Sequence, residues 1–397
     1  MMNRIFSLAG LVLATAGVTL GAEPIIYGYL EAPNIDLKAD YSKYNHIGLV
    51  FGVVNEDATF TFKNETGIND LVNKVHEKSG KVLAGLGGSG GSDNFSSIVA
   101  DEKLRNDFSQ HISDYIREMN LDGVDLDWVY VGRDISGCAT VDVANDGKNY
   151  LSFVEGLRKK LDDDFGPRKK LIAMGVRVFP FEGPDGPMKD MSEFAKVVDF
   201  ANLFSWDLNG PWDNTTGPLA PLDLPRGQGE QISSTSAIDA WVDAKWPANQ
   251  LTIGIPLYGR STQALENMLL DRENQYQPIS HDAPVGDADD EPRRSPCTGK
   301  TSTTGMWKWS NLVKQGVLKS PLEAEEPWVR QVDERTKTPW LFNRDTKVFL
   351  SMDDPDSVKA KIEVAKKRGL AGVNAFTIDQ DTGNQDMTNA IVEAWKK

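Results

Sequence analysis

Asp125, Asp127 and Val129 alternate along an apolar stretch that spans residues 121–132. Alternate side chains of a β-strand point the same way, so these three share one face while Leu126 and Trp128 take the other. Two acids at this spacing share hydrogen bonds or a proton, whereas valine can neither donate nor accept one. Acids on the inner face and apolar residues on the outer face are typical of a barrel strand wrapped by helices. A solvated edge strand is the alternative, but its acids rarely fall as Asp-x-Asp inside an apolar run.

The segment DGVDLDW at 122–128 resembles the signature D-G-x-D-x-D-W-E of glycoside hydrolase family 18, the chitinases and their chitinase-like relatives. The resemblance continues through Tyr130 and Gly132 to NDGKNY at 145–150, which is similar to the fungal branch. In that family the final Glu of the signature protonates the glycosidic oxygen, and this chain has Val129 there. The resemblance therefore implies a chitinase scaffold that lacks its acid.

The resemblance also implies substrate-assisted chemistry, which departs from the usual scheme of two carboxylates. The N-acetyl carbonyl of the sugar attacks its own anomeric carbon, while a carboxylate holds the acetamide N–H and a Tyr hydroxyl holds the acetamide oxygen. Asp127 matches the acetamide-holding position, and Asp125 matches the partner beneath it. Loss of general-acid help alone costs roughly 10²–10⁴-fold in rate. A purely structural role for the two acids is the alternative, because a buried acid pair can persist after catalysis is lost.

Further departures from the family pattern fall at the same implied site. FSWD at 204–207 is similar to the family's M-x-Y-D, so Trp206 replaces the Tyr that steadies the acetamide. GLGG at 85–88 lacks the Ser of S-x-G-G. Phe376 stands where the family has a Trp that floors the central subsite, and Phe offers less stacking area and no N–H. Several changes at one site indicate evolved loss of catalysis.

Other features of sugar binding are retained. NGPWD at 209–213 resembles H-G-x-W-D, and LYGR at 257–260 matches F-Y-G-R closely, with the arginine placed to donate to sugar hydroxyls. The residues implied to contact sugar are Trp206, Asp207, Trp212, Asp213, Tyr258, Arg260 and Phe376. For the aromatic residues among them, packing in the barrel core is the alternative.

Eight apolar, mostly β-branched runs alternate with helical stretches, which predicts the α/β class and a (β/α)8 TIM barrel. Leu104, Phe108, Ile112 and Ile116 recur every fourth residue and predict an amphipathic helix between the third and fourth runs. In such barrels, functional residues lie at the C-terminal ends of the strands. The runs are 24–31, 46–54, 81–88, 121–128, 170–178, 200–208, 251–260 and 369–379.

The gap between the seventh and eighth runs exceeds an ordinary connection. The resemblance implies a small α+β insertion there, at about 262–347, that forms one wall of the cleft. A disordered loop is the alternative, which the aromatic residues of GMWKW at 305–309 and PWLFN at 339–343 disfavour. The mature domain is thus expected to span 23–397.

Composition restricts the partners. The 397 residues include 43 basic and 58 acidic ones, and the net charge of −15 disfavours nucleic acid and anionic membranes while remaining compatible with a neutral sugar polymer. Residues 1–22 have the charged start, apolar core and small-residue end of a secretory signal. Cys138 and Cys297 are the only cysteines, and the sequence leaves open whether they pair. The four histidines show no metal-ligand spacing and GGSGG at 87–91 lacks a following Lys-Ser/Thr, so no metal or cofactor is expected.

The hypothesis that follows is a secreted, catalytically inactive chitinase-like protein that binds oligomers of chitin. Sequestering chitin fragments from a host's chitin receptors is a hypothesis for its role. One alternative is a residual chitinase whose acid has moved, with Glu31, Glu182 or Asp207 as candidates. The other is a barrel that binds or inhibits an unidentified host protein through its rim.

Overall fold

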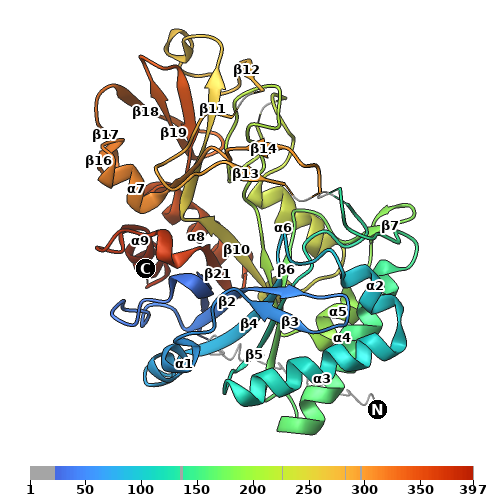
Figure 1. Ribbon diagram of the computed structural model, residues 1–397. Helices are drawn as coiled ribbons and strands as arrows, with labels where there is room; N and C mark the ends of the chain where they lie inside the picture. The colour runs from blue at the N-terminus through green and yellow to red at the C-terminus, as the bar shows by residue number, and fades with distance from the viewer. Residues whose placement is uncertain (1–22, 135–136, 226, 282, 296, 397) are drawn as a thin grey trace, which may run out of the picture.

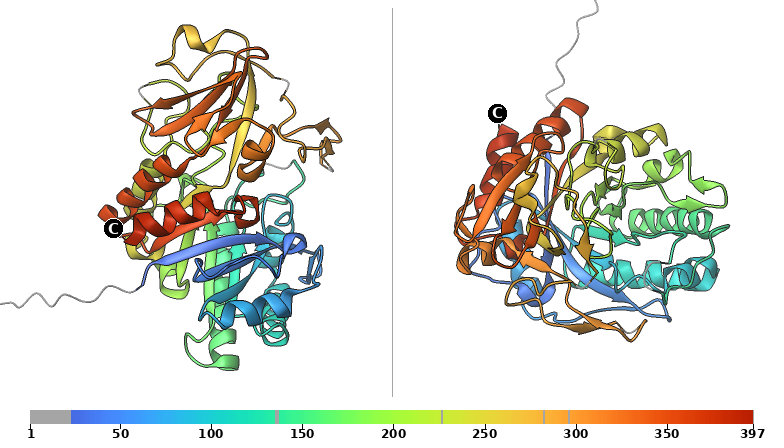
Figure 2. Two further views of the ribbon diagram at one scale, coloured as in Figure 1. Left: turned by 90° about the vertical axis from the view of Figure 1, so that its left-hand side faces the viewer. Right: turned by 90° about the horizontal axis from the view of Figure 1, so that it is seen from above.

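A closed barrel of parallel strands forms the centre of the molecule (Figures 1 and 2). The computed structural model describes residues 23–396 except 135–136, 226, 282 and 296, so the expected secretory signal at 1–22 lies outside the described residues. The first barrel strand pairs with both the second and the last, which closes the ring and confirms the predicted (β/α)8 barrel. In order around the barrel, the strands are β1 (Ile25–Glu31), β2 (His46–Val54), β4 (Lys81–Gly87), β5 (Gly123–Asp127), β6 (Leu171–Val176), β9 (Phe200–Leu203), β10 (Leu251–Pro256) and β21 (Gly372–Phe376).

Helices cover the outside of the barrel, as the view from above in Figure 2 shows. Leu126 and Trp128 on β5 and just after it are buried in the layer between strands and helices, as their alternation predicts. The predicted amphipathic helix is α3 (Glu102–Glu118), which begins where the Asp101 carboxylate accepts the Leu104 N–H at 2.9 Å. The other helices around the barrel are α1 (Ile68–His76), α2 (Phe95–Ala100), α4 (Asp146–Phe165), α5 (Ser192–Val197), α6 (Ser234–Asp243), α8 (Pro355–Arg368) and α9 (Asp386–Lys396). None of the helices in the described ranges has the length and apolar character required to cross a bilayer.

Six of the eight barrel strands end earlier than the sequence predicts, β5 and β10 among them. β5 stops at Asp127, where its carbonyl accepts the Gly88 N–H at 2.9 Å, and the Arg133 N–H then bonds to the Tyr130 carbonyl in a turn. Val129 therefore lies in the loop at the barrel mouth. The seventh strand stops at Pro256, and Tyr258 then begins a strand of a different sheet.

Between β10 and α8 the chain forms a second sheet beside the barrel, so the insertion expected there is present. Its main sheet is antiparallel and begins with β11 (Tyr258–Ala264), the strand that leaves the barrel mouth. The sheet continues through β12 (Ile279–Ser280), β15 (Met306–Lys308), β18 (Trp328–Asp333), β19 (Thr338–Asn343) and β20 (Val348–Ser351), with α7 (Trp309–Lys314) beside it. Figure 1 shows this unit standing above one side of the barrel.

Short strands at the periphery make up most of the remaining regular structure. They are β3 (Phe60–Phe62) on the edge of β2, β7 (Glu182–Gly183) with β8 (Gly186–Pro187), β13 (Arg293–Arg294) with β14 (Thr301–Ser302), and β16 (Leu318–Ser320) with β17 (Glu323–Ala324). Cys138 in the β5–α4 loop and Cys297 in the turn of the β13–β14 hairpin form a disulfide across 159 residues. The pairing that the sequence left open is therefore present.

Candidate functional site

Asp125 is the centre of a polar network inside the barrel. Its Oδ2 accepts hydrogen bonds from the hydroxyls of Tyr27 and Tyr29, each at 2.7 Å, and from the Asn202 side-chain amide at 3.1 Å. The carboxyl is fully buried, and desolvation raises its pKa. Three donors from β1 and β9 thus hold Asp125 beneath the barrel mouth, so its place is set by partners from distant parts of the sequence.

Asp127 lies one alternation further along β5, at the floor of the mouth. It is 2 % exposed, and its Oδ1 has no hydrogen-bond partner among the described residues. Position 175 on β6 is a glycine, and a Cβ there would clash with that oxygen at 2.1 Å. Burial first, and then the charge of Asp125, raise the pKa of Asp127 well above its usual value. The unpartnered oxygen is therefore packed against the backbone of Gly175, while the Asp127 side chain lines the cavity above it.

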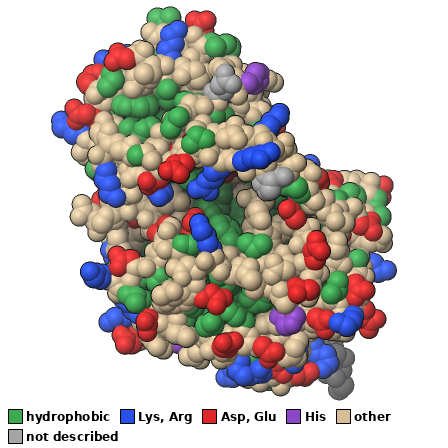
Figure 3. Space-filling view, viewed as in Figure 1, with side chains coloured by type: hydrophobic (Ala, Val, Ile, Leu, Met, Phe, Trp, Pro, Cys, Tyr) green, Lys and Arg blue, Asp and Glu red, His purple; other side chains and the backbone are tan. Residues whose placement is uncertain are grey.

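A cavity of about 300 Å³ opens above Asp127. Val129 and Tyr130, which come after Asp127 in the chain, also line this cavity. The Tyr130 ring lies 4.9 Å from the guanidinium of Arg177, another lining residue. Its remaining lining residues are Glu31, Phe51, Gly88, Ser89, Phe204, Trp206, Asp207, Tyr258, Arg260, Met306 and Phe376. Figure 3 shows the hollow on the front of the molecule, with hydrophobic side chains in its depth and basic ones near its rim.

Aromatic rings form the back of this cavity. Trp206, which is 9 % exposed, stacks on Phe204 with ring centroids 4.7 Å apart and lies 5.4 Å from Phe376. Tyr258 at the start of β11 is buried beside them, 6.4 Å from Phe376. These residues both pack together and line the cavity, so packing and ligand contact are compatible at this wall.

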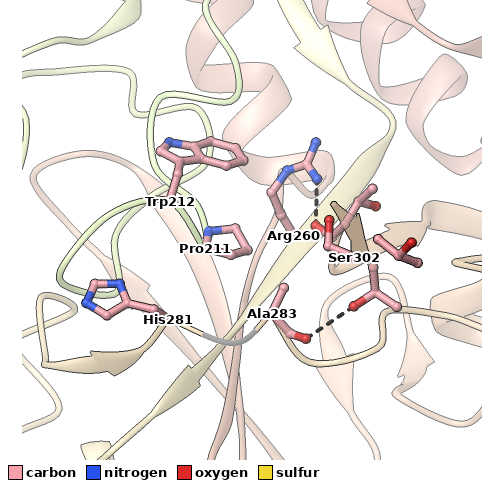
Figure 4. Close-up of a pocket in the computed structure, with 9 residues that line it drawn as sticks. Pro211, Trp212, Arg260, His281, Ala283 and Ser302 are labelled. Carbon is pink, nitrogen blue, oxygen red and sulfur yellow. Dashed lines mark hydrogen bonds between the residues drawn. The ribbon is translucent and has the colours of Figure 1, made fainter. Parts of the chain in front are cut away.

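A second cavity of about 550 Å³ lies beyond Arg260, which lines both (Figure 4). Arg260 is paired with Asp207, and its Nη1 donates to the Thr304 carbonyl at 2.7 Å. Trp212 forms one side of the second cavity, 57 % exposed, with the Arg260 guanidinium 5.3 Å from its ring. The opposite side is the segment 301–304, which begins with β14. An exposed indole beside a fixed guanidinium provides a stacking surface and a hydrogen-bonding group for a polar ring.

Three of the sequence-predicted acids lie in different surroundings. Asp213 lines neither cavity; its carboxylate accepts the Gly210 N–H at 2.8 Å and so shapes the loop that presents Trp212. Glu182 on the β7–β8 hairpin is also outside both linings and forms an ion pair with Arg133 at 3.2 Å. Glu31 lines the first cavity, and burial together with the charge of Asp379 raises its pKa.

The sequence analysis missed several residues of the site. Tyr27 and Tyr29 alternate on β1, and this alternation was the signal that both point into the barrel. Arg177 directly follows β6, at the strand end where functional residues are expected. Met306 in the insertion had no local signal, because only the fold of the insertion brings it over the cavity.

Comparisons with known proteins agree with this geometry. Residues 25–381 match the model of the glycosyl hydrolases family 18. The chain belongs to this family. Its relatives include a "chitinase-like effector" of Moniliophthora roreri, 30% identical over 358 residues that cover 87% of this chain and 85% of the relative. A "chitinase-like effector" of Moniliophthora perniciosa is 28% identical and covers 87% of this chain and 80% of its own.

This family 18 member also resembles solved structures. The crystal structure of a chitinase from Rhizomucor miehei superposes with a TM-score of 0.87 at 27% identity, over 94% of this chain and 100% of that one. The family thus contains both chitinases and proteins named chitinase-like effectors. Family membership alone therefore does not decide between catalysis and binding. The side chains at the barrel mouth have to distinguish the two.

Proposed function

We propose that this family 18 member is a catalytically inactive protein that binds oligomers of N-acetylglucosamine. One observation carries the proposal: Val129 lines the cavity on the strand end that also presents Asp127, at the position of the family's acid. Asp127 lines the cavity and can hold an acetamide N–H there, but Val129, the next cavity-lining side chain along the chain, has no proton to give. Hydrolysis needs a proton on the leaving oxygen, whereas binding does not.

The walls of the two cavities support sugar binding. Trp206 and Phe376 offer ring faces in the first cavity, and Trp212 offers an exposed ring in the second. Arg260 joins the two cavities, so a linear oligomer that passes it would contact both. Aromatic faces combined with a few fixed polar groups are typical of small-molecule sites.

A secreted, sequestering role fits the remaining features. The secretory pattern of residues 1–22 and the Cys138–Cys297 disulfide are both typical of exported proteins. A protein that binds chitin fragments without cutting them lowers their free concentration. In a fungus this would withhold the fragments from a host's chitin receptors, which is the role we propose.

Calorimetric titration with chitohexaose, together with product analysis after prolonged incubation, tests this function. We expect saturable binding and no release of shorter oligomers. Cellohexaose, which lacks acetamide groups, is the control ligand and should bind more weakly because Asp127 loses its partner. Cleavage of chitohexaose would contradict the proposed inactivity, and absence of binding would contradict the proposed role.

Glu31 supports a second candidate, a residual chitinase. It lines the cavity and holds its proton at higher pH than an exposed Glu, because burial and Asp379 disfavour its charge. It projects from the first strand, however, while Asp127 projects from the fourth, so the two do not neighbour each other around the barrel. Asp207 is a weaker candidate, because both of its carboxylate oxygens accept hydrogen bonds from Arg260. Slow hydrolysis that is lost in Glu31→Gln and retained in Glu182→Gln would favour this candidate.

The rival role as a protein-binding barrel predicts a different result. If the rim binds a host protein and the cavities are vestigial, chitohexaose will not bind, and substitutions inside the cavities will have no effect on any partner. The same titration therefore separates the two roles.

A further inference from the structure

The Cys138–Cys297 disulfide spans the mouth of the barrel. Cys138 lies in the loop after β5, the fourth barrel strand, and Cys297 belongs to the insertion, which leaves after the seventh strand and returns to the eighth. In a closed ring of eight strands the fourth and eighth are opposite each other. Figure 1 shows β13 and β14 running from the insertion toward the β5–α4 side. The bond therefore connects two opposite sides of the opening.

The β13–β14 hairpin, which carries Cys297, is fixed to the insertion at its base. Asp290, 6 % exposed, accepts hydrogen bonds from the Gly305 N–H at 2.8 Å and from the Thr304 hydroxyl at 2.7 Å. Asp287, also buried, accepts the Lys308 N–H at 2.7 Å. The insertion thus holds both strands of the hairpin at their base, and the disulfide holds the tip.

Between these two attachments the hairpin stands free. The four residues of β13 and β14 are all exposed, and in the sheets of the described residues the two strands pair only with each other. An isolated two-stranded hairpin is marginally stable in water, so its attachments at both ends keep it in place. Its second strand continues directly into both cavities: Thr301 to Thr304 line the larger one, and Met306 lines the one above Asp127.

The result is a closed ring at the barrel mouth, formed by paired barrel strands, the insertion and the disulfide. From Cys138 the ring runs back along the chain to β5, across the paired strands β6, β9 and β10 to β11, and along the insertion to Cys297. We propose that this ring makes the binding site a passage that a sugar chain must enter by one end. The inference rests on the proposed binding of chitin oligomers and adds the class of ligand: soluble oligomers and free chain ends rather than the interior of a long polymer.

Reduction of the disulfide would open the ring. Cys138 is exposed, so a reductant can reach the bond. With the bond broken, the tip of the hairpin is released while Asp287 and Asp290 still hold its base. A chain could then enter sideways between the hairpin and the β5–α4 loop.

A ligand blocked at both ends tests the passage. The probe is a chitin oligomer that carries biotin at each end on flexible linkers, with streptavidin bound to both. We expect the oxidised protein to bind the unblocked and the singly blocked oligomer but to lose binding of the doubly blocked one, whereas Cys138→Ser/Cys297→Ser should bind all three. Lys300→Ala alters the same hairpin turn without opening the ring and should behave like the oxidised parent.

A trapping experiment provides the second readout. Streptavidin added after the biotinylated oligomer has bound should lock the ligand on the oxidised protein until a reductant releases it. If the double variant does not fold, native protein that is reduced and capped at both thiols replaces it. Binding of the doubly blocked oligomer to oxidised protein as tightly as the unblocked one would overturn the passage. Failure of the oxidised and open forms alike to bind the unblocked oligomer would instead overturn the proposed function, and the passage with it.

Discussion

Arg260 and Asp207 form a bidentate pair, with Nε 2.8 Å from Oδ1 and Nη2 3.0 Å from Oδ2. Asp207 follows β9 of the barrel, where its backbone adopts a positive φ of 53°, and Arg260 lies on β11 of the insertion. The pair therefore joins the barrel to the wall of its cleft. It also orients the one side chain that lines both cavities.

Asp207→Ala should destabilise the fold by about 1–3 kcal/mol, because the Arg260 guanidinium, whose side chain is 11% exposed, loses its charged acceptor. The matched control is Asp239→Ala, which breaks an Arg–Asp pair whose side chains are 43% and 52% exposed and should cost less than about 1 kcal/mol. Denaturant unfolding measures both free energies. Equal losses would mean that the Arg260–Asp207 pair acts as an ordinary surface ion pair.

Trp212→Ala should weaken binding of chitohexaose by about 1–3 kcal/mol, the range found where an aromatic side chain stacks on a ring. The substitution removes an indole that is 57 % exposed and contributes little to the core, so the fold should be retained. Leu270→Ala removes an apolar side chain that is 85 % exposed and lines neither cavity. Calorimetry on both variants gives the affinities, and an unchanged affinity in Trp212→Ala would assign the indole a structural role only.

Val129→Glu alone should restore little or no hydrolysis, and Val129→Glu with Trp206→Tyr should restore more. The new carboxyl would lie beside Asp127, and two neighbouring carboxyls raise each other's tendency to hold a proton. The acetamide oxygen would still lack a hydroxyl, because Trp206 is held in a stack with Phe204 and fills that wall.

Release of shorter oligomers from chitohexaose measures this rescue. Val242→Glu, on the exposed side of α6, controls for the added charge. Strong activity from the single change would show that Trp206 is tolerated and that catalysis was lost at one position. Inactivity of the double variant would show that the cleft differs in further ways.

Asp127→Asn should raise the melting temperature at pH 7, and the gain should shrink toward pH 4. The pKa of Asp127 is raised above 3.8 in the folded state, so the folded protein keeps a proton that the unfolded chain releases. Stability therefore falls as pH rises from about 3.8 and levels off above the folded pKa. An amide remains neutral and avoids this loss. Thermal unfolding at several pH values compares Asp127→Asn with Asp243→Asn, a control on the surface. A gain in melting temperature that does not depend on pH would contradict the raised pKa of Asp127.

The sequence determined the framework, because local periodicity encodes it. Alternation in 121–128 and the recurrence of apolar runs predicted the barrel, and α3 followed from the spacing of Leu104 to Ile116. The motif around Asp125 and Asp127 also located the candidate site at the end of the correct strand. These features depend on neighbours within a few positions, which the chain itself specifies.

Only the tertiary structure decided which distant groups meet. Tyr27, Tyr29 and Asn202 converge on Asp125 because ring closure places β1 and β9 beside the interior of β5, and no short spacing encodes that. Cys138 and Cys297 are separated by 159 residues, and their pairing depends on how far the insertion reaches across the mouth. Contacts between elements remote in sequence arise from packing of the whole chain, so the polar floor and the bridge above it emerged only with the fold.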